Sequence, residues 1–280
     1  MGDVLAIANH KGGVGKTAIT VILASTISWL QRNKPDELPE EWRKKPILII
    51  DTDPQANTTE ALGFEPADLI MDILDLYNDP SIISNGGTSI ILSTRKLKNI
   101  ELIPSSIRLE KISVQLAAEI AGNVKLKQVV NKLRDRYSVI IIDTPPSLGI
   151  FTQNAVVAAD SVIIPLTLSK HALLGVSNML SFMRDAREIN KDLNVLGMVV
   201  NAFDRRYRLQ QALLMAVRKE YNGFVFDTVI PTSARIVENI AMRRNALHNI
   251  TPDHRNVLIS FVKEVADRMR REIEIPSGKG

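Results

Sequence analysis

The sequence predicts an α/β fold: a twisted, mostly parallel sheet with helices on both faces and a ligand at the strand ends. Short apolar runs of strand-forming residues, typical of strands buried on both faces, lie within residues 4–8, 47–50, 139–142, 159–165 and 195–201. Longer stretches with helical spacing alternate with them, at 18–31, 126–133 and 173–189. This alternation favours a single domain over residues 1–280.

Two segments stand apart from this alternation. Residues 33–46 hold three prolines and dense charge, so we expect a surface insertion, with Trp42 docked back onto the body. Residues 253–280 are expected to form a C-terminal helix and tail. Between the main elements, residues 89–92 and 100–103 are expected to be strands flanking a basic turn.

The first predicted strand leads into a glycine-rich loop, residues 10–17, which a helix follows directly. Glycines 12, 13 and 15 have no Cβ, so the backbone can turn tightly and direct its N–H groups at phosphate oxygens. The helix dipole, the Lys16 ammonium and the Thr17 hydroxyl suit a phosphate with Mg²⁺. A plain glycine turn between solvated lysines is the alternative, and the strand–loop–helix context disfavours it.

This loop departs from the general Walker A pattern, because His10 replaces the first glycine and a second lysine, Lys11, follows. It thereby resembles the deviant Walker A motif of the ParA/MinD family of P-loop ATPases. The resemblance implies ATP and Mg²⁺ as cofactors, and a nucleotide-binding set of Lys11, Gly12, Gly13, Val14, Gly15, Lys16, Thr17 and Ala18.

Acidic residues follow two of the predicted strands. Residues 51–57 resemble the family's switch I segment, and residues 139–146 its Walker B segment. By this resemblance Asp53 acts with Lys11 and Lys16 in catalysis, orienting the attacking water, and the metal ligands are Thr17, Asp51 and Asp143. Taken alone, Asp51 and Asp53 would more readily be read as helix or turn caps and Asp143 as a strand-ending acid, and the preceding Lys11 loop favours the functional reading.

Weaker similarity continues along the chain. An amide at the end of strand 195–201, Asn201, is implied to bind the adenine. A late strand at 229–231 would be followed by a loop that also packs on the base, which adds Pro231 and Thr232.

Positive charge is concentrated between residues 201 and 245, where eight basic residues face four acidic ones, an excess equal to the +4 of the whole chain. Arginine suits phosphate contacts. The resemblance implies non-specific DNA binding here, by Arg205, Arg206, Arg208, Arg218 and Arg235. An ordinary solvated basic face is the alternative.

Composition excludes several classes of protein. The absence of cysteine rules out disulfides, cysteine-ligated metal centres and thiol catalysis. The four histidines lack metal-site spacing. With neither a signal peptide nor a transmembrane run, we expect a cytoplasmic, nucleoid-associated protein. The closing basic helix resembles the membrane helix of MinD-like relatives, but acidic residues interrupt it, so membrane binding is not favoured.

The resemblance implies an ATPase that forms a homodimer around ATP, with Lys11 reaching the partner's phosphates. A ParB-like adaptor would link the ATP-bound, DNA-bound dimer to a plasmid or chromosome. Three alternatives stay open: a MinD-like division-site regulator, a ParA-like positioner of a protein organelle, and a nucleotide-gated scaffold with negligible turnover.

Overall fold

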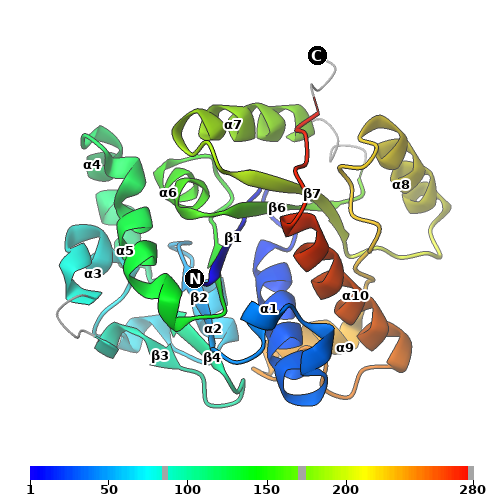
Figure 1. Cartoon of the computed structure of the whole chain (residues 1–280), viewed down its shortest axis with the longest axis horizontal. Helices are drawn as coiled ribbons and strands as arrows, with labels where there is room; N and C mark the ends of the chain where they lie inside the picture. Colours follow the sequence, from blue (N-terminus) through cyan, green and yellow to red (C-terminus); the bar gives the residue numbers. More distant parts are fainter. Residues whose placement is uncertain (84–87, 170–174, 277–280) are drawn as a thin grey trace.

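The computed structural model describes residues 1–83, 88–169 and 175–276 (Figure 1). Within these ranges, seven strands form one sheet in the order β3-β4-β2-β5-β1-β6-β7. Neighbouring strands run parallel except for β3, which pairs antiparallel with β4. The predicted fold class is therefore confirmed. The strands are β1 (Asp3–Ile7), β2 (Ile47–Asp51), β3 (Leu92–Ser93), β4 (Ile100–Ile103), β5 (Val139–Asp143), β6 (Ser161–Thr167) and β7 (Asn194–Asn201).

Helices cover both faces of the sheet (Figure 1). One face carries α3 (Ile73–Asn78), α4 (Ser113–Ala118), α5 (Lys125–Leu133), α6 (Ile150–Ala158) and α7 (Val176–Ile189). The other carries α1 (Lys16–Asn33), α9 (Ala234–Ala241) and α10 (Pro252–Met269). Two further helices are α2 (Asn57–Ala61), which follows β2, and α8 (Arg208–Glu220), which follows β7.

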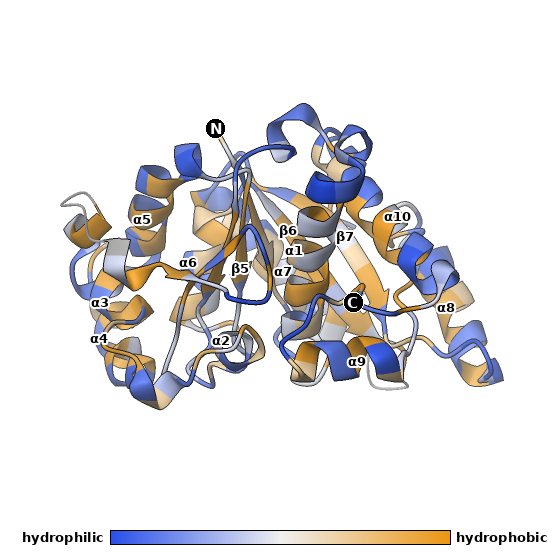
Figure 2. Cartoon of the chain, turned by 90° about the horizontal axis from the view of Figure 1, so that it is seen from below, coloured by the Kyte–Doolittle hydropathy of each residue, from blue (hydrophilic) through white to orange (hydrophobic). Residues whose placement is uncertain are grey.

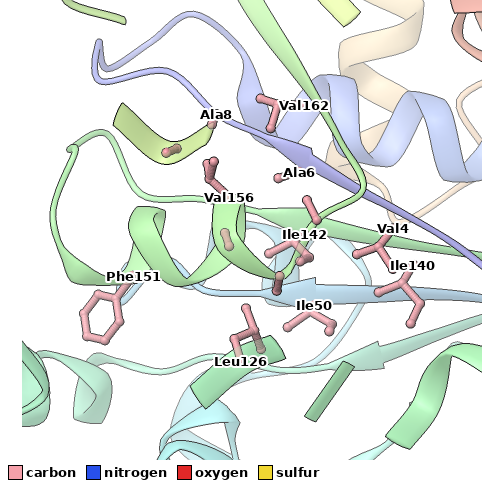
Figure 3. Packing of buried hydrophobic residues seen from close by; sticks show 14 of the residues in the cluster. Val4, Ala6, Ala8, Ile50, Leu126, Ile140, Ile142, Phe151, Val156 and Val162 are labelled. Carbon is pink, nitrogen blue, oxygen red and sulfur yellow. The ribbon is translucent and has the colours of Figure 1, made fainter. Parts of the chain in front are cut away.

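The two cores arise from the alternation of side chains along buried strands. In β1, Val4 and Ala6 pack on the α6 face, whereas Leu5 and Ile7 pack on the α1 face. Figure 3 shows the first set meeting Val156 and residues of β5. In Figure 2 the central strands are largely hydrophobic and the outer loops largely hydrophilic. Burial on both faces explains why these strands read as continuous apolar runs.

The structure corrects two predicted strands. Residues 88–90 form a 3₁₀ helix, and β3 is limited to Leu92 and Ser93 at the sheet edge. Residues 229–231 form no strand beyond an isolated bridge between Pro231 and Phe203. A proline has no N–H for a ladder hydrogen bond, which limits pairing there.

The insertion at 33–46 is folded onto the body, as predicted for Trp42. This side chain is only 1% exposed, and its indole N–H donates to Asp3 Oδ2 at 2.5 Å. Two 3₁₀ turns, Pro35–Glu37 and Glu40–Trp42, shape the segment. Burial raises the pKa of the Asp3 carboxyl, and the Trp42 hydrogen bond partly opposes that rise.

The closing helix α10 packs its apolar side against the sheet, with Phe261, Val262 and Val265 fully buried. Arg268 lies on the same buried side and is only 8% exposed, although its charge favours a surface position. Its guanidinium donates to the carbonyls of Leu196, Gly223 and Val225 and to Glu264. Its burial follows from its position, because residue 268 continues the 261–265 stripe at helical spacing. No helix among the described residues is long and apolar enough to cross a membrane.

Candidate nucleotide site

The site lies where the carboxyl ends of β1, β2 and β5 meet. Ile7, the last residue of β1, is in register with Asp143, the last residue of β5. Asp51, the last residue of β2, is also in register with Asp143. The glycine loop after β1 and both strand-end acids therefore share one edge of the parallel sheet, the edge at which open α/β sheets bind ligands.

The loop backbone is shaped to receive an anion. Gly13 and Gly15 have φ values of 73° and 87°, the left-handed region that favours glycine. The N–H groups of Gly12, Gly13, Val14 and Gly15 donate to no acceptor in the described part of the chain. Since α1 begins at Lys16, these amides and the positive end of the helix dipole act on the same position.

Lys16 is a buried cation with spare hydrogen-bonding capacity. Its side chain is 7% exposed, and Nζ donates to the Lys11 carbonyl at 3.2 Å. Burial lowers its pKa, while the nearby Asp143 and Asp53 carboxylates raise it. An ammonium group has three donors, so two remain for the oxygens of a phosphate.

Asp143 is the hydrogen-bonding centre of the site. Its Oδ2 accepts from the hydroxyls of Thr17 at 2.8 Å and Thr58 at 2.6 Å, and its Oδ1 from that of Thr20 at 3.3 Å. Burial raises the pKa of this carboxyl to about 6, against the effect of the threonine hydrogen bonds. The loop, helix α1 and helix α2 thus converge on one carboxylate.

Asp51 is fully buried and already bonded on both oxygens. Oδ2 accepts from the N–H and hydroxyl of Thr59, and Oδ1 from the Asp53 N–H. Burial and the facing Asp143 raise the pKa of Asp51 to about 8. These bonds fix α2 to the end of β2, and the role of Asp51 as a magnesium ligand stays a prediction.

The residues present suit a magnesium ion. Two buried carboxylates face each other with Lys16 as the adjacent cation, so a further positive charge would stabilise their ionised forms. Oxygen donors are what a hard cation requires, and Mg²⁺ keeps several of its waters beside one or two protein ligands. Thr17 and Asp143 are the residues that would hold it.

Asp53 follows Asp51 on the same side of the site and is 7% exposed. One oxygen, Oδ1, accepts from the Gln55 N–H at 2.9 Å. Burial raises the pKa of this carboxyl, and Lys16 partly opposes the rise. Its proximity to Lys16 fits the predicted catalytic position, although its action on a water is a matter for proposal.

Of the expected base-binding residues, Asn201 contacts the loop directly. Asn201 Nδ2 donates to the Val14 carbonyl at 3.0 Å, and a Cβ at Gly15 would lie 2.0 Å from that nitrogen. Two backbone hydrogen bonds then tie Phe203 to Ile230 and Thr232. The segment that holds Pro231 and Thr232 is therefore joined to the chain just after Asn201, and contact of these three residues with an adenine stays a prediction.

The five predicted DNA-binding arginines differ in their present engagements. Arg205 and Arg208 are exposed, with no side-chain hydrogen bond or ion pair to the residues that the structure describes. The other three are engaged: Arg206 with Asp204 at 2.6 Å, Arg235 with Glu238 at 2.9 Å, and Arg218 with the carbonyls of Phe226 and Asp227. DNA contacts by these three would compete with the observed bonds.

Sequence reasoning missed the threonines that organise the acids. Thr58 and Thr59 are fully buried and bind Asp143 and Asp51, respectively, from consecutive positions in α2. The available signal was a pair of consecutive hydroxyl residues within one short segment after the strand that ends at Asp51. Sequence reasoning also missed that His10 packs closely against Gly175. A Cβ on Gly175 would lie only 2.6 Å from the His10 ring. Among the histidines, His171 falls outside the described residues.

A glycine loop between a strand and a helix, with its lysine and threonine facing a strand-end aspartate, is the arrangement of a P-loop nucleotide-binding protein. Comparison with known families agrees: residues 2–195 match the model of an AAA domain. Bacillus subtilis sporulation initiation inhibitor protein Soj is 34% identical over 239 residues, covering 85% of this chain and 87% of Soj. Chromosome partitioning protein ParA of Myxococcus xanthus is 30% identical, covering 85% and 78%.

Solved structures give the same picture. A Mycobacterium smegmatis protein described as cobyrinic acid a,c-diamide synthase, with bound ADP and magnesium, superimposes with a TM-score of 0.78 at 26% identity over the full length of both chains. Cyanothece McdA has the same fold, with a TM-score of 0.78 at 24% identity. The chain belongs to the ParA/MinD family of P-loop ATPases, among its ParA- and Soj-type partition proteins.

Proposed function

We propose that this chain is a Mg²⁺-dependent ATPase, acting as one domain over its whole length, that partitions a cargo by cycling between free and DNA-bound states. The observation that carries the proposal is the convergence of Lys16, Thr17 and Asp143 at the glycine loop. The relationship to partition proteins and the nucleotide-bound structure of a neighbour support it.

In this proposal the loop amides and Lys16 bind the β- and γ-phosphates of ATP, with Thr17 and Asp143 holding the metal. A Mg²⁺ ion held there would supply positive charge against the charge that develops on the phosphate oxygens. Lys16 would exchange its bond to the Lys11 carbonyl for bonds to phosphate. Asp53, held by the Gln55 N–H, orients the attacking water.

The proposed dimer depends on Lys11. Its backbone N–H is fixed by Asn9 Oδ1 at 3.0 Å, whereas its side chain is partly exposed at the head of the loop. We propose that this ammonium reaches the phosphates bound by a second copy of the chain. A cation added at the transferring phosphoryl group would couple dimer formation to turnover.

Binding of DNA by the ATP dimer completes the cycle. Doubling a basic face doubles the phosphate contacts, which raises affinity and its dependence on salt. Phosphate contacts carry no sequence information, so binding would be non-specific. A ParB-like adaptor would stimulate hydrolysis and link the cycle to a plasmid or chromosome. The protein would then work in the cytoplasm, on the nucleoid.

The packing of α10 weighs against the MinD-like alternative. A membrane-binding helix must present its apolar face to lipid. In α10 that face, including Phe261 and Val265, is buried against the sheet. A ParA-like organelle positioner shares all the proposed chemistry and differs only in its adaptor.

The test is binding to non-specific duplex DNA with ATP, ADP or no nucleotide, at two salt concentrations, with anionic liposomes as a parallel surface. We expect binding that requires ATP and weakens steeply with salt. A matched pair of variants at exposed arginines, Arg205→Ala and Arg271→Ala, separates the proposed face from general charge. Equal DNA binding in all nucleotide states, or binding to liposomes alone, would refute the proposal.

A further inference from the structure

A cavity of about 720 Å³ opens between the segment after α2, the β3–β4 region and Arg243, which lies two residues beyond the end of α9. Its apolar lining comes from Leu62, Phe64, Leu69, Ile70, Met71 and Leu92. Figure 2 places α2 and α9 along the same edge of the molecule. The volume falls within the range of ligand sites in proteins, roughly 300–1,000 Å³. None of these lining residues belongs to the nucleotide site described above.

Cationic side chains also line this cavity: Arg95, Lys96 and Arg243. Arg95 and Lys96 are exposed, and no side-chain partner for either occurs within the described ranges. The three cations outnumber the two acids of the lining, Glu65 and Asp68. The cavity therefore combines an apolar interior with an excess of positive charge.

The backbone of Arg243 adopts a conformation that is unfavourable for a residue with a side chain. Its φ is 59°, a left-handed value at the end of α9, where glycine or asparagine is the usual residue. Its guanidinium points at the segment after α2, donating to the Gly63 carbonyl at 3.4 Å. This long bond leaves most of the five N–H donors of the guanidinium for another acceptor. A strained residue that carries a charge to a cavity edge suits a binding role.

We propose that this cavity binds an amphipathic anion, a small molecule with an alkyl or aromatic body and one carboxylate, sulfonate or phosphate group. The alkyl or aromatic part of the ligand would cover the leucine, phenylalanine and methionine side chains of the lining and so exclude water from them. The anionic group would meet Arg95, Lys96 and Arg243. Duplex DNA would satisfy the cations but leave the apolar walls unfilled, so it fits this site less well.

Occupancy of the cavity is coupled to the nucleotide site through α2, a step that rests on the proposed function. The Leu62 and Phe64 N–H groups bond to the carbonyls of Thr58 and Thr59. The hydroxyls of these two threonines bond in turn to Asp143 and Asp51. A shift of α2 on ATP binding would move one wall of the cavity. By linkage, the anion and ATP then change each other's affinity by the same factor.

The first experiment measures decanoate binding to the nucleotide-free protein by calorimetry, with decyltrimethylammonium as the probe of opposite charge. Displacement of 8-anilino-1-naphthalenesulfonate fluorescence gives a second readout. We expect saturable decanoate binding and at least about tenfold weaker binding of the cationic probe, as a charge-assisted contact predicts. Equal binding of the two probes, or no saturable binding, would overturn the proposal.

Variants locate the site. The double variant Arg95→Ala/Lys96→Ala should weaken decanoate about tenfold. The matched control Lys44→Ala/Lys191→Ala removes the same charge from exposed positions outside the cavity lining and should leave affinity unchanged. Leu69→Asp, which places a carboxylate in the half-buried wall, should abolish binding while thermal melting reports retained folding. Equal weakening in both double variants would refute the assignment.

A final measurement separates this inference from the proposed function. MgATP affinity is determined alone and with saturating decanoate, and should change by at least threefold. Decanoate binding with no effect on MgATP would overturn the coupling. Loss of MgATP binding altogether, with decanoate binding intact, would refute the proposed function and the coupling but leave the cavity assignment standing.

Discussion

Replacing Arg268 by methionine should destabilise the protein strongly, because this arginine joins α10, β7 and the segment 223–231 in one buried network. Its donors reach the Leu196 and Val225 carbonyls at 2.8 Å, Gly223 at 3.1 Å and Glu264 at 2.9 Å. The guanidinium also stacks on the Phe226 ring, 4.3 Å from its centroid. Methionine keeps much of the volume but none of the donors.

Removing one partner of a buried ion pair costs about 3–5 kcal/mol. The lower part of that range applies here because Glu264 keeps two other donors, the N–H groups of Asp227 at 2.7 Å and Thr228 at 2.8 Å. The carbonyls of Leu196 and Val225 would lose their charged donor. We therefore expect a loss of about 3 kcal/mol in the free energy of unfolding.

Urea unfolding followed by circular dichroism measures this loss, provided that the slope of free energy against urea stays constant. Arg270→Met is the control, since Arg270 directly follows the same helix and has an exposed side chain with a 3.5 Å contact to Glu41. An exposed pair of this kind is worth about 0–1 kcal/mol. If both variants lose the same small amount, the Arg268 network does not support the fold as argued.

Three further outcomes are expected. Lys11→Ala should keep ATP binding but lose the ATP-dependent dimer, measured by light scattering; an unchanged dimer would exclude the cross-subunit role. Asp53→Ala should trap the ATP dimer and reduce phosphate release at least tenfold; turnover at the parent rate would show that Asp53 does not act on the water. Trp42→Phe should lower stability by about 1–2 kcal/mol, because the buried indole loses its bond to the Asp3 carboxylate; an unchanged unfolding midpoint would contradict this.

The sequence predicted the parts of the site that are local in the chain. The loop 10–17 lies between a strand and a helix that its own residues form, and Asp51 and Asp143 each end an apolar run. Parallel pairing then brings those ends together, as it must when strands share a sheet. Local pattern and topology rules were therefore sufficient for Lys16, Thr17 and both acids to be assigned to one edge.

Contacts between distant segments were not predictable in the same way. The bond from Asn201 to the Val14 carbonyl joins residues 187 positions apart, and no pattern in the sequence indicated it; the family resemblance implied only that Asn201 binds the adenine. The burial of Arg268 was readable from its helical spacing, but its charge favoured a surface position. The prediction of a strand over residues 89–92 failed because most of this apolar segment lies in or beside a 3₁₀ helix, and only Leu92 and Ser93 pair in the sheet.

Helix α2 is the element through which the site could act on the rest of the molecule. It is only five residues long, too short to be stable by itself, so its position depends on tertiary bonds. Thr58 and Thr59 provide these bonds, to the two carboxylates whose charges a magnesium ion would neutralise. A cation that draws Asp143 toward itself weakens the acceptor on which Thr58 relies. The same step that completes the nucleotide site would thus loosen α2, and with it the wall formed by the residues that follow.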